Sequence, residues 1–208
     1  MRKIGVEIFK YEELSDRAKN RAYNNYVNNF DYPWDSENQA SLDKFCFYFD
    51  VEIDNMINQR CDFSLNVEEP VLELKGLRLH TYIINNYYDY IHKGRYYSVG
   101  HYENGKYQYK SRYSKVIPSR DCVLTGYYMD DEILGKMYKF IDYPTEFDSD
   151  ITLYDLIEMC LDDYMQSVND DYESMISEEY FVERVEEEDT DFYENGEIAY
   201  YDKEQLIG

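Results

Sequence analysis

Between residues 153 and 168 the sequence carries its longest amphipathic pattern. The apolar members recur about every 3.6 residues and are Leu153, Leu156, Ile157, Cys160, Leu161, Tyr164 and Val168. Acidic residues such as Asp155 and Glu158 fall off this stripe. A helix of this kind has to bury its apolar face against other elements. The pattern therefore predicts a long helix packed on a core, with Ser149 or Asp150 as its N-cap.

Helical spacing also marks shorter segments elsewhere in the chain. The expected helices follow the cap candidate Ser15, cover residues 36–49 and 82–92, begin near Asp130, and follow the cap candidate Ser177. Asp16 supports the first of them, because its carboxylate would meet the positive end of the helix dipole. We expect about five helices.

The clearest strand signal is a β-hairpin around Asn104-Gly105, since this pair is the preferred two-residue type I′ turn. Such a hairpin would pair Tyr102 with Tyr107, Gly100 with Tyr109 and Tyr97 with Arg112. Residues 50–80 alternate in strand fashion, with Gly76 as a turn or bulge between strand pieces. A second Asn-Gly turn is expected at residues 195–196.

These elements predict an α+β fold with short antiparallel hairpins. The 208 residues, 44% of them hydrophobic, suit a single domain over 1–208. The charge changes sharply within it: residues 76–121 carry a net charge of +5, and residues 122–208 carry −22 of the total of −23. A subdivision into a mixed-charge part, 1–121, and an acidic helical part, 122–208, is the alternative.

The charge and hydropathy also exclude several classes of partner. A phosphate binder needs an excess of Lys and Arg, so we expect no direct binding of DNA. The sequence has no run of 18 apolar residues, so we expect no membrane span. The N-terminus reaches Glu7 before any apolar run, which predicts no secretory signal and a cytoplasmic location. Self-association as a homodimer is left open.

The search for catalytic motifs is mostly negative. The nine glycines form no phosphate-binding loop, and no serine-nucleophile elbow is present. The four cysteines, Cys46, Cys61, Cys122 and Cys160, are scattered and are expected to be reduced thiols rather than metal ligands. We therefore expect no cofactor, no metal and no catalytic residues.

One alternative is a metal-dependent nuclease. Asp62 precedes Glu73 and Lys75 on a segment expected to be a strand. In nucleases with this order, two carboxylates hold Mg²⁺ and the lysine supports the attacking water. The competing interpretation is an edge strand whose alternating charges face solvent.

Acidic residues continue from the last expected helix into the second Asn-Gly turn. They are Glu186, Glu187, Glu188, Asp189, Asp191 and Glu194, with Asp162 and Asp163 on the long helix as a second group. Carboxylates spaced along a rigid surface can imitate the phosphates of a duplex, and nearby tyrosines add contact area. Such a surface would bind a nucleic-acid-handling protein in the groove meant for DNA or RNA. The alternative is an acidic surface that only maintains solubility.

The 26 tyrosines allow a second interpretation. Tyr97, Tyr107 and Tyr109 lie on the expected hairpin, whose second strand is basic, and single-stranded RNA could stack on them. The net charge of −23 argues against this.

Four stretches resemble a family of acidic proteins from phages and prophages. Residues 11–22, YEELSDRAKNRA, resemble the family's opening Y-x-E-L-S-x-x-A-K-x-x-A. Residues 172–179 and 191–196 resemble its closing Y-E-x-x-x-S-x-E and E/D-F-x-E-x-G, and residues 95–101 resemble its central R-Y-x-H strand. The family's Gly-rich central segment is replaced here by Asp62-Phe63-Ser64-Leu65.

The resemblance implies a phage protein that inhibits bacterial defence, as anti-CRISPR proteins do. The expected partner is then a host protein, a CRISPR effector nuclease or another nucleic-acid-binding defence protein. The expected activity is binding through the acidic surface, without catalysis. An antitoxin-like protein that binds a small basic toxin is a further alternative.

Overall fold

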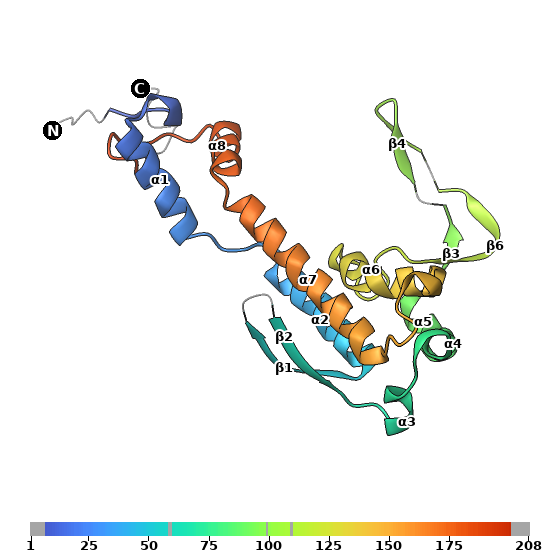
Figure 1. Cartoon of the computed structure of the whole chain (residues 1–208). Helices are drawn as coiled ribbons and strands as arrows, with labels where there is room; N and C mark the ends of the chain where they lie inside the picture. The colour runs from blue at the N-terminus through green and yellow to red at the C-terminus, as the bar shows by residue number, and fades with distance from the viewer. Residues whose placement is uncertain (1–6, 58–59, 99, 109, 201–208) are drawn as a thin grey trace. The chain divides into compact units, whose positions relative to one another are not determined.

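The computed structural model describes residues 7–57, 60–98, 100–108 and 110–200 (Figure 1). The predicted α+β class is confirmed: the described residues form helices together with short antiparallel strand pairs. There are eight α-helices in this part of the chain, more than the expected five, because several are single turns or lie where strands were predicted. None of the helices searched in the described residues is long and apolar enough to cross a membrane.

The helices are α1 (Asp16–Asn28), α2 (Asp35–Phe49), α3 (Glu69–Leu72), α4 (Gly76–Asn86), α5 (Tyr88–Ile91), α6 (Met129–Asp142), α7 (Leu153–Met175) and α8 (Glu178–Glu187). Short 3₁₀ helices cover Tyr11–Glu13 and Pro144–Glu146. The strands are β1 (Val51–Ile57), β2 (Arg60–Leu65), β3 (Lys93–Tyr97), β4 (His101–Glu103), β5 (Lys106–Gln108) and β6 (Arg112–Ser119). They pair as three antiparallel ladders, β1 with β2, β3 with β6, and β4 with β5.

Contacts divide the chain into two compact units. Unit 1 comprises Met1–Pro33 and Asp170–Gly208, and unit 2 comprises Trp34–Asn169. The expected division at residue 121 therefore falls inside unit 2. A single domain over 1–208 stays a prediction, because compact units of this kind occur both within one domain and as separate domains.

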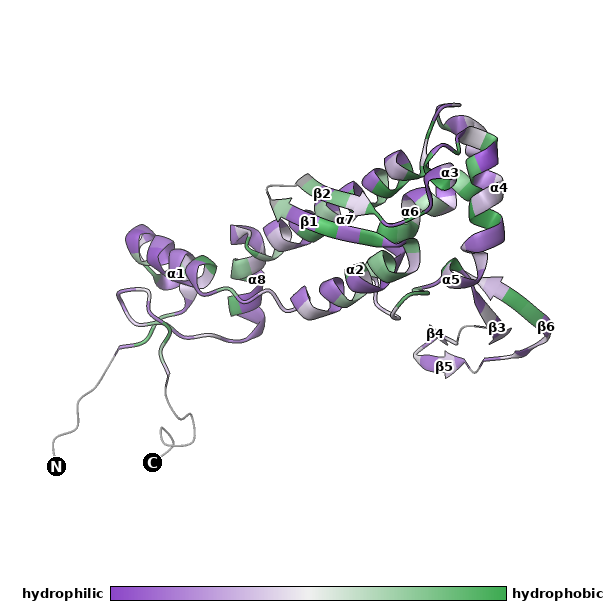
Figure 2. Ribbon diagram, turned by 90° about the horizontal axis from the view of Figure 1, so that it is seen from below, coloured by the Kyte–Doolittle hydropathy of each residue, from purple (hydrophilic) through white to green (hydrophobic). Residues whose placement is uncertain are grey.

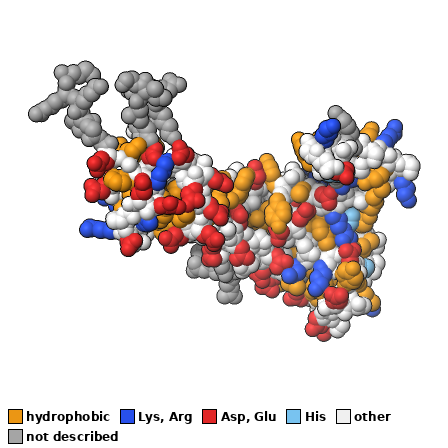
Figure 3. Space-filling view, turned by 90° about the horizontal axis from the view of Figure 1, so that it is seen from above, with side chains coloured by type: hydrophobic (Ala, Val, Ile, Leu, Met, Phe, Trp, Pro, Cys, Tyr) orange, Lys and Arg blue, Asp and Glu red, His pale blue; other side chains and the backbone are white. Residues whose placement is uncertain are grey.

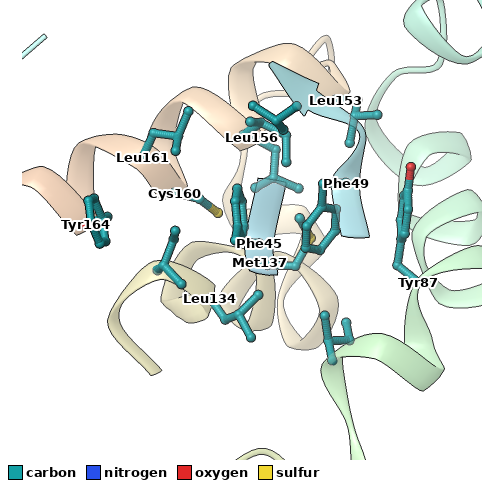
Figure 4. Close-up of a cluster of buried hydrophobic side chains, with 14 of the residues drawn as sticks. Phe45, Phe49, Tyr87, Leu134, Met137, Leu153, Leu156, Cys160, Leu161 and Tyr164 are labelled. Carbon is teal, nitrogen blue, oxygen red and sulfur yellow. The ribbon is translucent and has the colours of Figure 1, made fainter. Parts of the chain in front are cut away.

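The apolar stripe of α7 lies at the centre of the unit 2 core (Figure 4). Leu156, Cys160 and Leu161 are fully buried there, as the helical spacing predicts. Phe45 and Phe49 of α2 pack beside them with ring centroids 4.7 Å apart.

Unit 1 has a smaller core of its own. Its buried members are Tyr11, Leu14, Ala18, Ala22, Phe181, Val185 and Phe192. Two predicted N-caps are confirmed: Ser15 accepts a hydrogen bond from the Ala18 amide, and Ser177 accepts one from the Tyr180 amide. Both caps fix helices that supply this core.

Two tyrosines of α1 satisfy backbone carbonyls at the end of α7. The hydroxyl of Tyr26 donates to the Met175 carbonyl at 2.6 Å, and that of Tyr23 donates to the Ile176 carbonyl at 2.8 Å. The last carbonyls of a helix have no partner within the helix. Part of the unusual tyrosine content is therefore structural, because a long side chain with a polar tip can cross an apolar contact and still donate.

The strands predicted on both sides of Gly76 were wrong. Residues 69–72 form α3 and residues 76–86 form α4. Gly76 has a φ of +50°, and its amide donates to the Ile151 carbonyl at 3.1 Å. A Cβ at this position would lie 2.5 Å from the Ser149 backbone oxygen. A long-range contact that only glycine allows thus fixes the start of α4.

The N-cap predicted for α7 was also wrong. Asp148 accepts a hydrogen bond from the Asp150 amide in the preceding turn, and α7 begins only at Leu153. The Thr152 hydroxyl accepts from the Asp155 amide, and the Asp155 carboxylate accepts from the Thr152 amide. This reciprocal pair resembles a capping box.

The predicted hairpin at Asn104-Gly105 is confirmed. Both residues have positive φ, +51° and +72°, as a type I′ turn requires. Tyr102 lies opposite Tyr107, as expected, and the pairing of Tyr97 with Arg112 is also present, in the β3–β6 ladder. The expected partner of Gly100, Tyr109, lies outside the described residues.

A polar network closes the base of the β3–β6 ladder. Arg120 donates from Nε to His92 Nε2 at 3.0 Å and binds the Asp142 carboxylate through both terminal nitrogens. Since His92 Nε2 accepts, Nδ1 carries the proton and donates to the Tyr88 carbonyl at 3.1 Å. Burial, and secondarily the charge of Arg120, lowers the pKa of His92. The imidazole is therefore neutral in this network.

We expect Gly76→Ala to lower the free energy of unfolding of unit 2 by about 2 kcal/mol or more, because strain at positive φ adds to the clash with Ser149. Gly105→Ala is the matched control, since Gly105 also has positive φ but nothing lies within 4 Å of its Cβ position. It should cost about 1 kcal/mol. Urea unfolding followed by circular dichroism measures both, and equal effects would contradict the steric contribution at Gly76.

We expect unit 2 to lose stability as the pH falls below about 6.5, the ordinary value for histidine. The folded pKa of His92 is the lower one, so the unfolded chain takes up the proton first and protonation favours unfolding. His92→Gln should flatten the dependence of the urea midpoint on pH between 7.5 and 5.5. His101→Gln, at an exposed histidine of β4, is the control and should leave the wild-type slope. An equal slope in all three proteins would contradict the role of His92.

Candidate protein-binding surface

The six predicted acidic residues of the C-terminal group all lie in unit 1. Glu186 and Glu187 occupy the last turn of α8, and Glu188 follows as its C-cap. Asp189 and Asp191 continue into the segment that leads to Phe192, and Glu194 precedes the turn at Asn195-Gly196. Figure 3 shows acidic side chains spread over unit 1 on the face drawn. The structure thus brings the group onto one helix end and the segment that follows it.

Two of these carboxylates are tied to the other end of the sequence. Lys10 Nζ lies 2.6 Å from an Asp189 oxygen and 2.8 Å from an Asp191 oxygen. The hydrogen bond to Asp189, followed by that to Asp191, raises the pKa of Lys10 above its usual range. Next to them, Phe9 and Phe192 form an antiparallel bridge. The Asp191 side chain is 11% exposed, so its pair with Lys10 ties the two ends of the unit together, whereas the Asp189 side chain is 69% exposed. Both stay a prediction as partner contacts.

A third carboxylate is neutralised on its own helix. Arg184 Nε donates to Glu188 at 2.9 Å, an ion pair at the i, i+4 spacing, which raises the pKa of Arg184. The guanidinium also lies over the Tyr26 ring, 5.9 Å from its centroid. This pair fixes the only described cation of α8.

Three carboxylates remain exposed without an ion pair among the described residues: Glu186, Glu187 and Glu194. The first two sit where a negative charge is unfavourable, because the C-terminal end of a helix carries partial negative charge. Glu187 is also four residues after Glu183, another exposed acid, and like charges at this spacing repel. Their placement opposes the stability of α8.

Glu183 belongs with this group, although it is not among the residues predicted from the sequence. It is exposed on α8 and has no ion pair in the described part of the chain. The signal was present in the sequence, since Glu179, Glu183 and Glu187 recur every four residues. We define the carboxylate surface as Glu183, Glu186, Glu187 and Glu194.

A groove of about 920 Å³ lies in the same unit. Its apolar lining includes Tyr26, Phe30, Phe181 and Phe192. Carboxylates of Asp31, Glu188 and Glu197 lie along it as well. Glu197 is paired with Arg21, and the groove thus combines aromatic walls with partly neutralised acids.

The second predicted acidic group lies in unit 2. Asp163 is paired with Lys136 at 3.1 Å, and Asp162 is exposed on α7. The two acidic groups therefore belong to different units. Asp162 and Asp163 stay a prediction as partner contacts.

The residues proposed for the nuclease alternative do not share a strand. Asp62 lies on β2, whereas Glu73 and Lys75 lie between α3 and α4. Among the described residues, no three His, Cys, Asp or Glu side chains are grouped so that they could hold a metal ion. The strand on which that motif depended is therefore absent at Glu73 and Lys75.

All four cysteines are free thiols, as expected. Cys160 is buried in the unit 2 core, and the other three are half-buried. Burial raises the pKa of Cys160 and of Cys46 to about 12. Thiols with these pKa values are almost entirely protonated at neutral pH and are poor nucleophiles.

No protein-family model, curated protein or solved structure matches this chain. The resemblance to acidic phage proteins stays a prediction.

We expect Asp191→Asn to destabilise unit 1 by about 1–2 kcal/mol, because the Asp191 side chain is 11% exposed and binds Lys10. Glu194→Gln removes one acid from the same segment, but Glu194 is exposed and has no ion pair among the described residues. It should change stability by less than about 0.5 kcal/mol. Thermal unfolding of the two variants measures the difference, and equal effects would contradict the structural role assigned to Asp191.

Proposed function

We propose that this protein inhibits a nucleic-acid-handling defence protein by binding it through the carboxylate surface of unit 1. Carboxylates of Glu183, Glu186, Glu187 and Glu194 would occupy positions where the target holds phosphates. The target class that the family resemblance implies is a CRISPR effector nuclease in the cytoplasm of a bacterial host. The protein acts by occupancy, without catalysis of its own.

The observation that carries this proposal is the unfavourable placement of the charges. Glu186 and Glu187 lie at the negative end of the α8 dipole, and Glu187 also faces Glu183 at like-charge spacing. Each feature costs a few tenths of a kcal/mol. A surface kept only for solubility would not need acids at these positions, since other exposed positions carry no such penalty. Binding to a basic partner gives a reason for them.

Electrostatic steering suits such a partner. Nucleic-acid-binding proteins present clusters of Lys and Arg, and a complementary acidic surface accelerates their encounter. Exposed charge pairs are screened over about 10 Å at 0.1 M salt and about 3 Å at 1 M salt. The complex should therefore weaken as salt rises.

The groove adds apolar contact area, which the exposed carboxylates do not provide. Its walls of Tyr26, Phe30, Phe181 and Phe192 offer aromatic area next to the carboxylates of Asp31 and Glu197. A basic segment with an apolar side chain fits this combination, because the apolar group can be buried while the cations stay near the acids.

We expect the triple variant Glu186→Gln, Glu187→Gln, Glu194→Gln to lose the partner while unit 1 stays folded. The tagged wild type and variant would be compared in pull-downs from a bacterial host lysate at 0.05 and 0.5 M salt, with the captured proteins identified by mass spectrometry. The wild type should capture a basic nucleic-acid-binding protein at low salt and release it at high salt. An oligonucleotide known to bind that protein should compete.

The matched control neutralises three exposed acids of unit 2, Asp54, Glu69 and Glu158, and should retain the partner. Thermal unfolding adds a second criterion, because the helix-end changes Glu186→Gln and Glu187→Gln should raise the stability of unit 1 by about 0.3–1 kcal/mol. Loss of binding with a gain in stability separates function from folding. Equal capture by the triple variant and the control, or no capture by the wild type, would contradict the proposal.

A further inference from the structure

The second surface that calls for an explanation is the β-ribbon of unit 2. It consists of β3 and β6 and the hairpin β4–β5, within residues 93–98, 100–108 and 110–119. All of its described side chains are exposed or half-buried. A two-stranded ribbon in water is marginally stable unless something covers it. Burial in a core therefore does not explain the aromatic and apolar side chains of the ribbon.

Aromatic rings on the ribbon are exposed to an unusual degree. Tyr102 is 76% exposed, Tyr96 58%, Tyr97 49% and Tyr107 46%. Tyr102 and Tyr107 face each other across the hairpin with ring centroids 5.4 Å apart, and Tyr97 lies opposite Arg112. Tyr102 and Tyr107 thus share the β4–β5 ladder, and Tyr97 lies in the β3–β6 ladder. Figure 2 also shows an apolar stretch on β6.

The ribbon is basic in an acidic chain. Residues 93–119 hold six Lys and Arg and one acid, Glu103, a net charge of +5 against −23 for the whole chain. Lys93 donates to the Cys122 carbonyl and Arg95 pairs with Asp121, so both serve the base of the ribbon. The other four cations, Lys106, Lys110, Arg112 and Lys115, are exposed and form no ion pair with the described residues.

Protection of the strand edges explains the exposed cations of the ribbon but not its exposed aromatic rings. Lysines on exposed strands prevent edge-to-edge aggregation. The same logic would remove exposed rings and apolar side chains from the ribbon, yet Tyr96, Tyr102, Val116 and Ile117 are all more than a third exposed. Rings beside unpaired cations are the composition of a stacking platform for nucleic acid.

We propose that the described part of this ribbon, residues 93–98, 100–108 and 110–119, binds single-stranded nucleic acid. Bases would stack on Tyr97, Tyr102 and Tyr107, and phosphates would lie near Lys106, Lys110, Arg112 and Lys115. The ribbon's positive charge acts locally, because charges farther away than about 8 Å are screened at physiological salt. The proposal uses residues of unit 2 alone and does not depend on the function proposed for unit 1.

The test is fluorescence anisotropy of the full chain with labelled 12-nucleotide oligo-U, oligo-dT and a 12-base-pair duplex. Both single strands should bind more tightly than the duplex, and a preference for oligo-U would identify RNA as the ligand. Four phosphate contacts predict a slope of log K against log salt of about −3 for single strands, which is about a 50-fold loss between 50 and 200 mM salt.

Variants separate stacking from charge. Tyr102→Ala should weaken binding about 5- to 140-fold, whereas Tyr102→Phe should bind like the wild type. Lys106→Gln with Lys110→Gln should reduce the salt slope by about 1.4. Tyr128→Ala is the control, since Tyr128 is 72% exposed in unit 2 outside the ribbon, and it should have no effect.

Several outcomes would overturn the proposal. They are absence of binding at 50 mM salt, equal affinity for duplex and single strand, and unchanged affinity in Tyr102→Ala. Sedimentation velocity tests the competing occupant, the acidic surface of a second copy. A dimer of the wild type that dissociates in the Lys106→Gln, Lys110→Gln variant would assign the ribbon to self-association instead.

Discussion

Burial of the α7 stripe is the interaction on which unit 2 depends. Leu153, Leu156, Ile157, Cys160 and Leu161 are fully buried, and α2 and α6 supply the side chains that enclose them. Each such side chain contributes about 1.5–3 kcal/mol when it is taken out of water. The unit can therefore carry a long exposed ribbon and many surface charges, features that add little stability themselves. Residues 170–175 of α7 belong to unit 1, and there the Met175 carbonyl accepts a hydrogen bond from the Tyr26 hydroxyl.

Local rules predicted the helices well where the apolar spacing was unambiguous. The stripe of α7, the Ser15 and Ser177 caps and the Asn104-Gly105 turn all depend on residues within a few positions of one another. Around Gly76 the spacing of Val71, Leu74 and Leu77 fits a helix as well as strand pieces. The contact of Gly76 with Ile151 and Ser149 decides between them, and it joins segments that no local pattern connects.

The candidate site was less predictable for the same reason. The acidic group was visible in the sequence, but its division into structural and exposed members was not. Lys10 binds Asp189 and Asp191 from 179 and 181 positions away, so the sequence alone could not show that these two carboxylates are paired. The pair Arg184–Glu188 could have been predicted from its spacing of four residues. The place of Glu183 in the acidic group could have been predicted in the same way, since it completes a repeat with Glu179 and Glu187.

The charged residues of this chain fall into two groups, those that stabilise the fold through an ion pair and those that do not. Where a carboxylate stabilises the fold, it has a partner: Asp142 binds Arg120, and Asp191 binds Lys10. Where it has none, as at the end of α8, the local electrostatics oppose it. The basic ribbon shows the same division: Arg95 is paired at its base, whereas Lys106 and Arg112 have no ion pair among the described residues. Unpaired charge of both signs, in two different units, is a composition suited to contacts with other molecules, since neither group adds to the stability of its own unit.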